Sequence, residues 1–143
     1  MAWTLCESRS VLVASKAYLR RHGTPHKPQD LAPHNCLHYP RVQETPVWRF
    51  TPIQKRSKSQ HAAAVTVPIR GRLSANNSEA LREAALAGAG IALMPDFSAQ
   101  ACLSKGQLVA VLPRWHVEGG FGHHIFAIRP YSHHVPRAVS ALV

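Results

Sequence analysis

Acidic side chains are scarce in this sequence of 143 residues, which has 7 Asp and Glu against 17 Lys and Arg. The formal net charge is therefore +10 before any of the 10 histidines is protonated, and this charge favours acidic partners such as phosphates or carboxylates. Because the carboxylates are so few and are scattered along the chain, a pair of them for acid–base catalysis is not expected. The sequence therefore predicts no catalytic residues.

Long apolar runs are also missing. The longest, residues 108–112, has five residues, and stretches such as 62–65 have four, far below the roughly 18 residues that a membrane span needs. The first seven residues lack the basic start and the long apolar middle of a secretory signal. These absences predict a cytoplasmic protein that does not enter a membrane. Hydrophobic residues make up 45% of the chain, which is near the globular average and enough to form the core of one domain.

The cysteine and histidine patterns indicate no disulfide framework and no metal centre. Cys6, Cys36 and Cys102 are odd in number and far apart, so they are expected to be reduced and mainly structural. His123-His124 and His133-His134 are the only dense histidine groups. Adjacent residues on a strand point to opposite faces, and no Cys or carboxylate stands beside them at ligand spacing.

No catalytic or nucleotide-binding motif is present either. The sequence has no Gly-x-Ser-x-Gly elbow and no His-Glu-x-x-His helix. Its Gly88-Ala89-Gly90 segment follows a predicted helix and precedes a predicted strand, the reverse of the order in a dinucleotide-binding loop. We expect this segment to end a helix, and we predict no cofactor.

Strand signals alternate with helix signals along the chain, which predicts an α/β fold. The expected strands are residues 11–14, 36–39, 47–50, 65–73, 91–94, 108–112 and 124–128. The expected helices are residues 16–22, 28–35, 76–88, 96–104 and 135–143. Pro68 and Gly71 interrupt the fourth strand, so an edge position or a bulge is predicted there. Residues 113–122 are expected to be turn-rich, and the basic segment 55–60 to be a solvated hairpin tip rather than a phosphate-binding patch.

Several residues are predicted to begin or end these helices. Ser15 is expected to cap the first helix, with Gly23 after its end. Asn76, with Glu79 three residues later, fits a capping box. Asp96 is expected to cap the helix that follows the strand at 91–94.

Two strand-to-helix junctions, residues 74–78 and 94–97, are the best candidates for a binding function. Each places helix N-terminal amides at the carboxyl end of a strand, where open α/β sheets collect ligands and where anions are favoured. Asn77 and Ser78 could add side-chain donors for a small carboxylate. The alternative is that Asn76 and Ser78 only cap their helix. Asp96 argues against an anion at the second junction.

The order of the sequence motifs resembles the effector-binding domain of LysR-type transcriptional regulators. The segments that carry this resemblance are VLVASKAYL (11–19), GTP (23–25), PQDL (28–31), CL (36–37), WRF (48–50), GRLSANNSEAL (71–81) and GAGIALMPDF (88–97). The resemblance implies a periplasmic-binding-protein-like (type 2) α/β fold, with two subdomains and a cleft for a small molecule between them. It also implies an effector-binding wall of Tyr39, Pro40, Asn77, Ser78 and Pro95, with Asp96 and Phe97 packed nearby.

The same resemblance suggests a division of the chain. Residues 1–11 are expected to be a remnant of the first subdomain and the hinge, residues 12–112 the second subdomain, and residues 113–143 a return strand and helix toward the first. The family's N-terminal helix-turn-helix and most of the first subdomain are missing, so we expect a truncated regulator or a fragment.

The function expected from these patterns is ligand sensing in a transcriptional regulator that forms a homodimer or a higher oligomer. Its effector is expected to be a small anionic metabolite, and it would contact DNA only through a helix-turn-helix domain absent from this chain. One alternative is a non-specific nucleic-acid-binding module that uses Arg41, Arg49, Lys55, Arg56, Lys58, Arg70 and Arg72. Another is a fragment without independent function, whose exposed apolar sheet surface would cause self-association.

Overall fold

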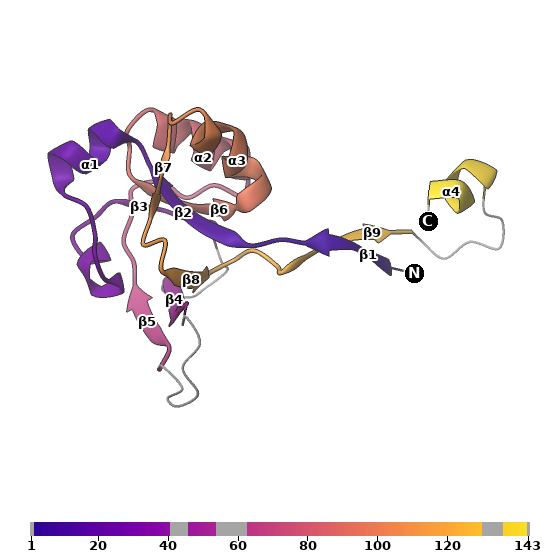
Figure 1. Ribbon diagram of the computed structural model, residues 1–143, viewed down its shortest axis with the longest axis horizontal. Helices are drawn as coiled ribbons and strands as arrows, with labels where there is room; N and C mark the ends of the chain where they lie inside the picture. Colours follow the sequence, from indigo (N-terminus) through magenta and orange to yellow (C-terminus); the bar gives the residue numbers. More distant parts are fainter. Residues whose placement is uncertain (1, 41–45, 54–62, 130–135, 143) are drawn as a thin grey trace. The chain divides into compact units, whose positions relative to one another are not determined.

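A computed structural model describes residues 2–40, 46–53, 63–129 and 136–142. These residues form two units, which we call the ribbon unit (Met1–Arg9 and Gly122–Val143) and the sheet unit (Ser10–Phe121). Figure 1 labels their helices and strands. Among the described residues, no helix has the length and apolar character needed to cross a membrane.

A four-stranded sheet forms the centre of the sheet unit, with the strand order β3-β6-β2-β7. The strands are β2 (Ser10–Ala14), β3 (Cys36–Leu37), β6 (Ile91–Pro95) and β7 (Val109–Val111). Strands β3 and β6 are parallel, whereas β2 runs antiparallel to β6 and β7. The carboxyl ends of β3 and β6 therefore meet at one edge of the sheet, and their amino ends meet at the opposite edge.

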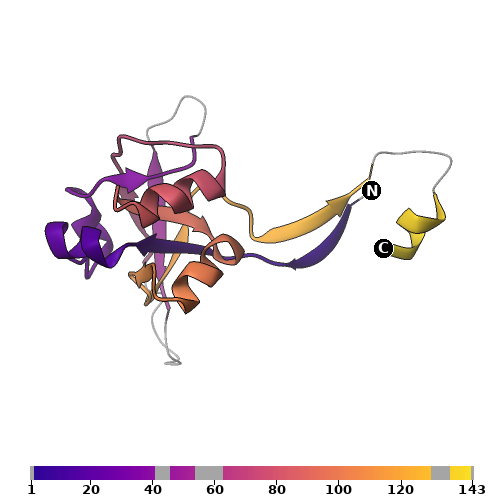
Figure 2. The ribbon, with the colours of Figure 1, turned by 90° about the horizontal axis from the view of Figure 1, so that it is seen from above.

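Helices α2 (Ser78–Leu86) and α3 (Asp96–Ser104) cover one face of this sheet (Figure 2). Every second strand residue, including Val13 and Ala92, points into the core on this face, as the period of two in a strand requires. Leu81 and Ala85 lie four residues apart on α2 and are completely buried in the same core. Burial of this helix stripe, rather than intrinsic helix propensity, holds the nine-residue helix α2 in place.

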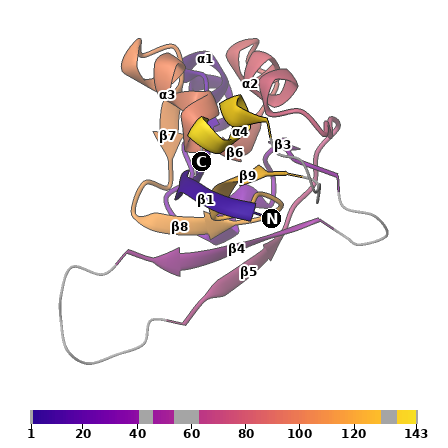
Figure 3. The same cartoon turned by 90° about the vertical axis from the view of Figure 1, so that its right-hand side faces the viewer.

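A three-stranded antiparallel sheet covers the opposite face. Its order is β5-β4-β8, with β4 at Val47–Pro52, β5 at Val65–Pro68 and β8 at Trp115–Glu118. Trp48 and Phe50 of β4 are buried with Leu12 and Leu93 of the central sheet. Helix α1 (Lys16–His22) and the 3-10 turn η1 (Pro28–Leu31) add Tyr18 and Leu31 to this core. The sheet unit therefore has helices, a central sheet and a second sheet in successive layers (Figure 3).

The ribbon unit contains a two-stranded antiparallel sheet, formed by β1 (Ala2–Glu7) and β9 (His124–Ile128). A bulge between Thr4 and Cys6 shifts its register. The short helix α4 spans Arg137–Leu142. Leu5, Phe126 and Ile128 of the two strands are exposed by 60%, 50% and 78%.

Most of the predicted elements are confirmed. The strands expected at residues 11–14, 91–94 and 124–128 and the helices at 16–22 and 96–104 are present within one residue of the predicted bounds. Ser15 accepts the Tyr18 backbone N–H as the N-cap of α1, and Gly23, at φ 88°, ends that helix. The interrupted strand is β5, which ends at Pro68 and lies at the edge of its sheet.

Two predicted elements are wrong. The helix expected at residues 28–35 is only the 3-10 turn η1, because Pro33 has no N–H to continue it and disfavours helical geometry at the residue before it. The segment 113–122, expected to be turn-rich, contains β8, which pairs with β4. In the sequence, the proline and glycines that flank β8 indicate turns, so the alternating pattern of its apolar residues Trp115 and Val117 is not recognised as a strand. The basic segment 55–60 lies outside the described residues.

Candidate functional site

The two predicted junctions meet at one edge of the central sheet, which we call the carboxyl edge. Ser74 forms a parallel bridge with His38, directly after β3, and the Ala75 N–H donates to the His38 carbonyl at 3.1 Å. The ends of three parallel segments thus lie together, at Ser74, His38 and Pro95. The predicted wall residues follow or close these segments: Tyr39, Pro40, Asn77, Ser78 and Pro95.

Asn77 is the N-cap of α2. Its backbone is extended, at φ −136° and ψ 121°, and its Oδ1 accepts the N–H of Glu79 at 2.7 Å and of Ala80 at 3.3 Å. The prediction that Asn76 caps this helix is therefore wrong by one residue. The helix begins at Ser78, because the Asn77 side chain is the one that reaches the N–H groups of the first turn. Because Oδ1 is used by the cap, the amide nitrogen is the group of Asn77 that can donate to an anion.

Ser78 joins the first turns of the two helices at this edge. Its Oγ lies 3.0 Å from Oγ of Ser98 in α3, and Ser98 is buried. A hydroxyl has one proton and two lone pairs, and either hydroxyl can be the donor of this contact. When Ser98 donates to Ser78, the Ser78 proton can donate to a ligand at the edge. The contact fixes the position of Ser78 relative to α3.

The second junction differs from its prediction. Pro95, not Asp96, is the N-cap of α3, and no side-chain oxygen caps this helix. Asp96 is the first helical residue, and its Oδ1 accepts the Phe97 N–H at 2.8 Å. The carboxylate lies in the first turn of α3, where the helix dipole favours negative charge. It therefore competes with an external anion at this junction, as expected from the sequence.

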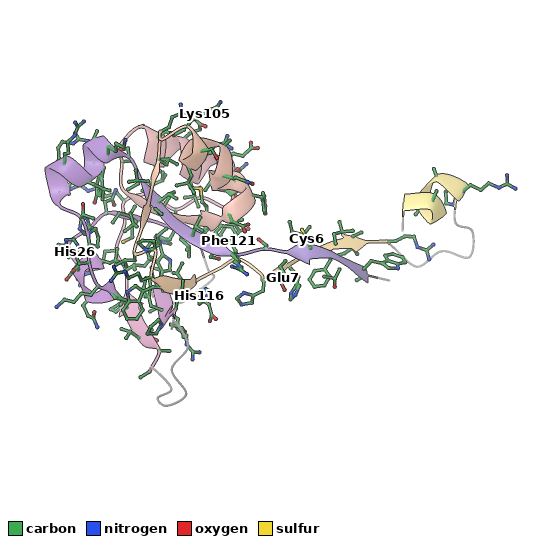
Figure 4. The ribbon with its side chains drawn as sticks, viewed as in Figure 1. Cys6, Glu7, His26, Lys105, His116 and Phe121 are labelled. Carbon is green, nitrogen blue, oxygen red and sulfur yellow. The ribbon has the colours of Figure 1, made fainter. Side chains whose placement is uncertain are left out.

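An aromatic pair completes the edge. The Tyr39 and Phe121 rings meet edge to face, with centroids 5.4 Å apart and an interplanar angle of 68°. Gly120, directly before Phe121, has φ 113°, a backbone conformation that glycine adopts and other residues rarely do. Figure 4 labels Phe121. Phe121 was not among the predicted site residues, because it follows two glycines in the segment expected to be turns. An aromatic residue in such a loop is the sequence feature that could have indicated it.

The five predicted wall residues differ in accessibility. Asn77 and Pro40 are exposed, Tyr39 and Ser78 are half-buried, and Pro95 is buried. Asn77, Ser78 and Tyr39 are thus the polar groups that a molecule at this edge can reach. Pro95 ends β6 and is the N-cap of α3. All five assignments remain predictions of ligand contact.

Groups with shifted pKa values lie away from the carboxyl edge. Burial raises the pKa of the Cys36 thiol to about 12, so this thiol stays protonated at neutral pH and is a poor nucleophile. All three cysteines are free, and Cys36 and Cys102 are buried, as expected. Within the described residues, no group of three or more His, Cys, Asp or Glu side chains is arranged to hold a metal ion. His133 and His134 are not among those residues.

Known proteins with similar sequences are transcriptional regulators. The chain is 32% identical over 138 residues to the probable HTH-type transcriptional regulator LtrA of Klebsiella pneumoniae, covering 94% of this chain and 41% of that protein. It is 32% identical over 140 residues to the HTH-type transcriptional regulator PtxR of Pseudomonas aeruginosa, covering 97% of this chain and 41% of that protein. The chain therefore spans about two fifths of these curated relatives.

Solved structures give the same result. The full-length virulence activator AphB of Vibrio cholerae matches with a TM-score of 0.70 and 30% identity, over 88% of this chain and 39% of that one. The regulatory domain of AphB in Vibrio vulnificus matches with a TM-score of 0.70 and 27% identity, over 98% and 64%. The fold class is thus the periplasmic-binding-protein-like type 2 α/β fold of these regulatory domains. Residues 2–143 match the LysR substrate binding domain family, and the chain belongs to that family.

Proposed function

We propose that this chain is the ligand-sensing part of a LysR-type transcriptional regulator and that its carboxyl edge is one wall of the effector site. The observation that carries the proposal is the convergence of Tyr39, Asn77 and Ser78 at that edge, in a member of this family. In this reading the sheet unit, which contains the predicted residues 12–112 and also β8, is the second subdomain. The ribbon unit belongs to the hinge and the first subdomain.

The proposed effector is a small anionic metabolite. The amide nitrogen of Asn77 and the hydroxyl of Ser78 are hydrogen-bond donors, and a carboxylate accepts from such groups. The Tyr39 ring, held by Phe121, offers an apolar wall for the rest of the molecule. Because the Asp96 carboxylate already lies in the first turn of α3, the charged group of the effector is proposed to bind at α2 rather than at α3.

In the complete regulator, binding would change transcription without any catalytic step. A ligand that binds one arrangement of the subdomains more tightly than another shifts the population toward it. We propose that this shift alters a dimer or a higher oligomer, which reaches DNA through a helix-turn-helix domain in the cytoplasm. The names of the two relatives support this reading, since both are described as HTH-type transcriptional regulators.

Calorimetric titration of the complete regulator with a panel of organic acids and amino acids tests the proposal. We expect one compound to bind saturably, and Asn77→Ala or Ser78→Ala to weaken it. Asn76→Ala is the matched control, because Asn76 is an exposed neighbour that does not cap α2. The site assignment fails if no compound binds, or if both site variants bind the effector and regulate transcription like the unchanged protein.

The nucleic-acid alternative remains a prediction with a different signature. Of its seven basic residues, the structure describes Arg49, Arg70 and Arg72, and all three are exposed. Binding of duplex DNA by this chain alone, with a steep loss of affinity on adding salt, would favour that alternative. Salt-resistant binding of one small anion would favour ligand sensing.

A further inference from the structure

A polar cavity lies at the end of the central sheet where β3 and β6 begin, which we call the amino edge. Its volume is about 540 Å³, within the range of small-molecule sites. Its lining residues are Tyr18, His22, Ala32, Pro33, His34, Asn35, Arg70, Gly71, Arg72 and Ala89. None of the predicted effector residues is among them. Since β3 and β6 are parallel, this cavity and the carboxyl edge are at opposite ends of the sheet.

One wall of the cavity is aromatic and rigid. The rings of Tyr18 and His22, one turn apart on α1, stack with centroids 4.5 Å apart at 26°. Tyr18 is 2% exposed, its hydroxyl lies 3.0 Å from Nδ1 of His34, and it accepts the Asn35 N–H at 3.0 Å. This wall is therefore fixed before any ligand arrives.

The facing wall is cationic. The segment Arg70-Gly71-Arg72 runs beside Asn35 and Cys36, because the Cys36 N–H donates to the Arg70 carbonyl at 2.8 Å and the Arg72 N–H donates to Oδ1 of Asn35 at 2.8 Å. Gly71 permits this approach, since a Cβ there would clash with the Cys36 carbonyl. The segment thus fixes two arginines two residues apart at the rim of the cavity.

These arginines have no acidic partner within the described part of the chain, where the ion pairs are Arg9–Glu7 and Arg82–Glu83. No Asp or Glu of the described residues lines the cavity. The nearby Asp30 carboxylate accepts the backbone N–H groups of His26 and Lys27. Two arginines therefore line the cavity, and no described carboxylate pairs with them.

Two backbone carbonyls beside the cavity are already bonded. The Ala89 carbonyl accepts from the side-chain amide of Asn35 at 2.6 Å, and the Gly88 carbonyl accepts from Arg21 at 3.4 Å. Both carbonyls follow the C-terminal end of α2 at Leu86, where the helix dipole is negative. Asn35 and Arg21 offset that negative end beside the cavity.

We infer that this cavity is a second binding site, for a small phosphate-bearing or carboxylate-bearing anion. Arg70 and Arg72 bind the charged group, and guanidinium groups match both phosphate and carboxylate geometry. The exposed His22 ring, held by its stacking on Tyr18, supports the flat or apolar remainder of the ligand. The site is distinct from the proposed effector wall and does not depend on it.

The test uses inorganic phosphate and succinate as separate probes of this 143-residue chain, because they distinguish the two kinds of anion. Binding is followed through the histidine ring signals in NMR, with the His22 signal assigned by His22→Gln. We expect saturable shifts of His22 with at least one probe. The double variant Arg70→Gln/Arg72→Gln should weaken binding by about tenfold or more, since charge-assisted hydrogen bonds are lost.

The double variant Arg114→Gln/Lys105→Gln is the matched control, because it removes the same net charge from two exposed residues outside the cavity. It should bind the probes like the unchanged chain, and so should Asn77→Ala. Arg70→Lys/Arg72→Lys should recover part of the affinity lost by the glutamine pair. The inference is overturned if neither probe gives a saturable shift at millimolar concentration. It is also overturned if the control pair weakens binding equally, or if Asn77→Ala abolishes it.

Discussion

At the residue scale, Asn77 combines a helix cap with a proposed ligand contact, and two substitutions separate these roles. Asn77→Ala removes the acceptor for the Glu79 and Ala80 N–H groups. It should lower the free energy of unfolding by about 1 kcal/mol, as typical N-cap losses do. Asn77→Asp keeps that acceptor and should be as stable as the unchanged chain, measured by urea unfolding.

Effector binding by the two Asn77 variants should not follow their stability. Asn77→Asp places a negative charge where the effector anion is proposed to lie, so it should weaken effector binding despite intact stability. If Asn77→Asp binds the effector as well as the unchanged protein does, Asn77 is a cap only.

Tyr18 is a second residue whose hydroxyl can be tested alone. It accepts from Asn35 N–H and contacts His34, with both partners at 3.0 Å. Tyr18→Phe keeps the ring but leaves these groups unpaired, which should cost about 1–3 kcal/mol in chemical unfolding. Tyr39→Phe is the control, because Tyr39 is half-buried and its ring contact with Phe121 needs no hydroxyl. Equal stability of Tyr18→Phe and the unchanged chain would contradict this role.

His34 gives a pH dependence of known sign. Burial, with the charge of His22 as a smaller cause, lowers the pKa of His34 in the folded chain, while Asp30 opposes the shift. The unfolded chain therefore binds the proton more readily, and stability rises with pH in that range. His34 should stabilise the fold fully above its unfolded pKa of about 6.5 and progressively less as pH falls below it.

The check is urea unfolding between about pH 7.5 and pH 5 for the unchanged chain and for His34→Gln. The unchanged chain should lose more stability on acidification than the variant loses, because Gln does not titrate. The same pH slope in both proteins would show that other groups cause the acid sensitivity.

At the element scale, the close contact between the starts of β3 and β6 depends on Gly90. A Cβ at this position would clash with the Asn35 carbonyl, which accepts the Ile91 N–H at 2.9 Å. Gly90→Ala should therefore force the strands apart and cost about 1–3 kcal/mol or more. Gly122→Ala, whose Cβ would have its nearest neighbour at 3.9 Å, should change the thermal unfolding midpoint little. A Gly90→Ala chain with an unchanged midpoint would contradict the close contact.

Elements with strong local signals were predictable from the sequence. Strand β6 was predicted from its apolar run, which ends at Pro95. Helix α1 was predicted from its cap Ser15 and from Gly23 after its end. In both elements the tertiary structure keeps what the local sequence favours. Other bounds depended on packing. The N-cap of α2 was predicted one residue too early, because either of two neighbouring asparagines can cap a helix and only the structure shows which side chain accepts the first-turn N–H groups. Strand β8 was missed, because its pairing with β4 is a long-range contact that no local pattern contains.

At the scale of the whole molecule, the ribbon unit exposes apolar side chains from both of its strands, with Leu5 at 60%, Phe126 at 50% and Ile128 at 78%. A two-stranded sheet is marginally stable in water on its own, and exposed strands with apolar side chains favour association. The isolated chain should therefore self-associate as its concentration rises. Analytical ultracentrifugation measures this directly.

The double variant Phe126→Lys/Ile128→Lys should reduce that association. Ile53→Lys is a control of the same chemistry, since Ile53 is an exposed apolar residue of the sheet unit, at 47%. A chain that remains monomeric at high concentration, or variants that associate alike, would contradict a role for the ribbon.

The sequence by itself determined the α/β class, the family and most helix and strand positions, because these follow from local periodicity, caps and an ordered series of motifs. It also indicated which junctions carry helix amides. Only the tertiary structure decided which residues share an edge. Parallel pairing of β3 with β6 and of Ser74 with His38 brings Tyr39 to Asn77 and Ser78. The contact of Asn35 with residues 70–72 places Arg70 and Arg72 opposite Tyr18. Such contacts join segments more than 30 residues apart in the sequence, and their energy comes from burial and hydrogen bonds that local patterns do not record.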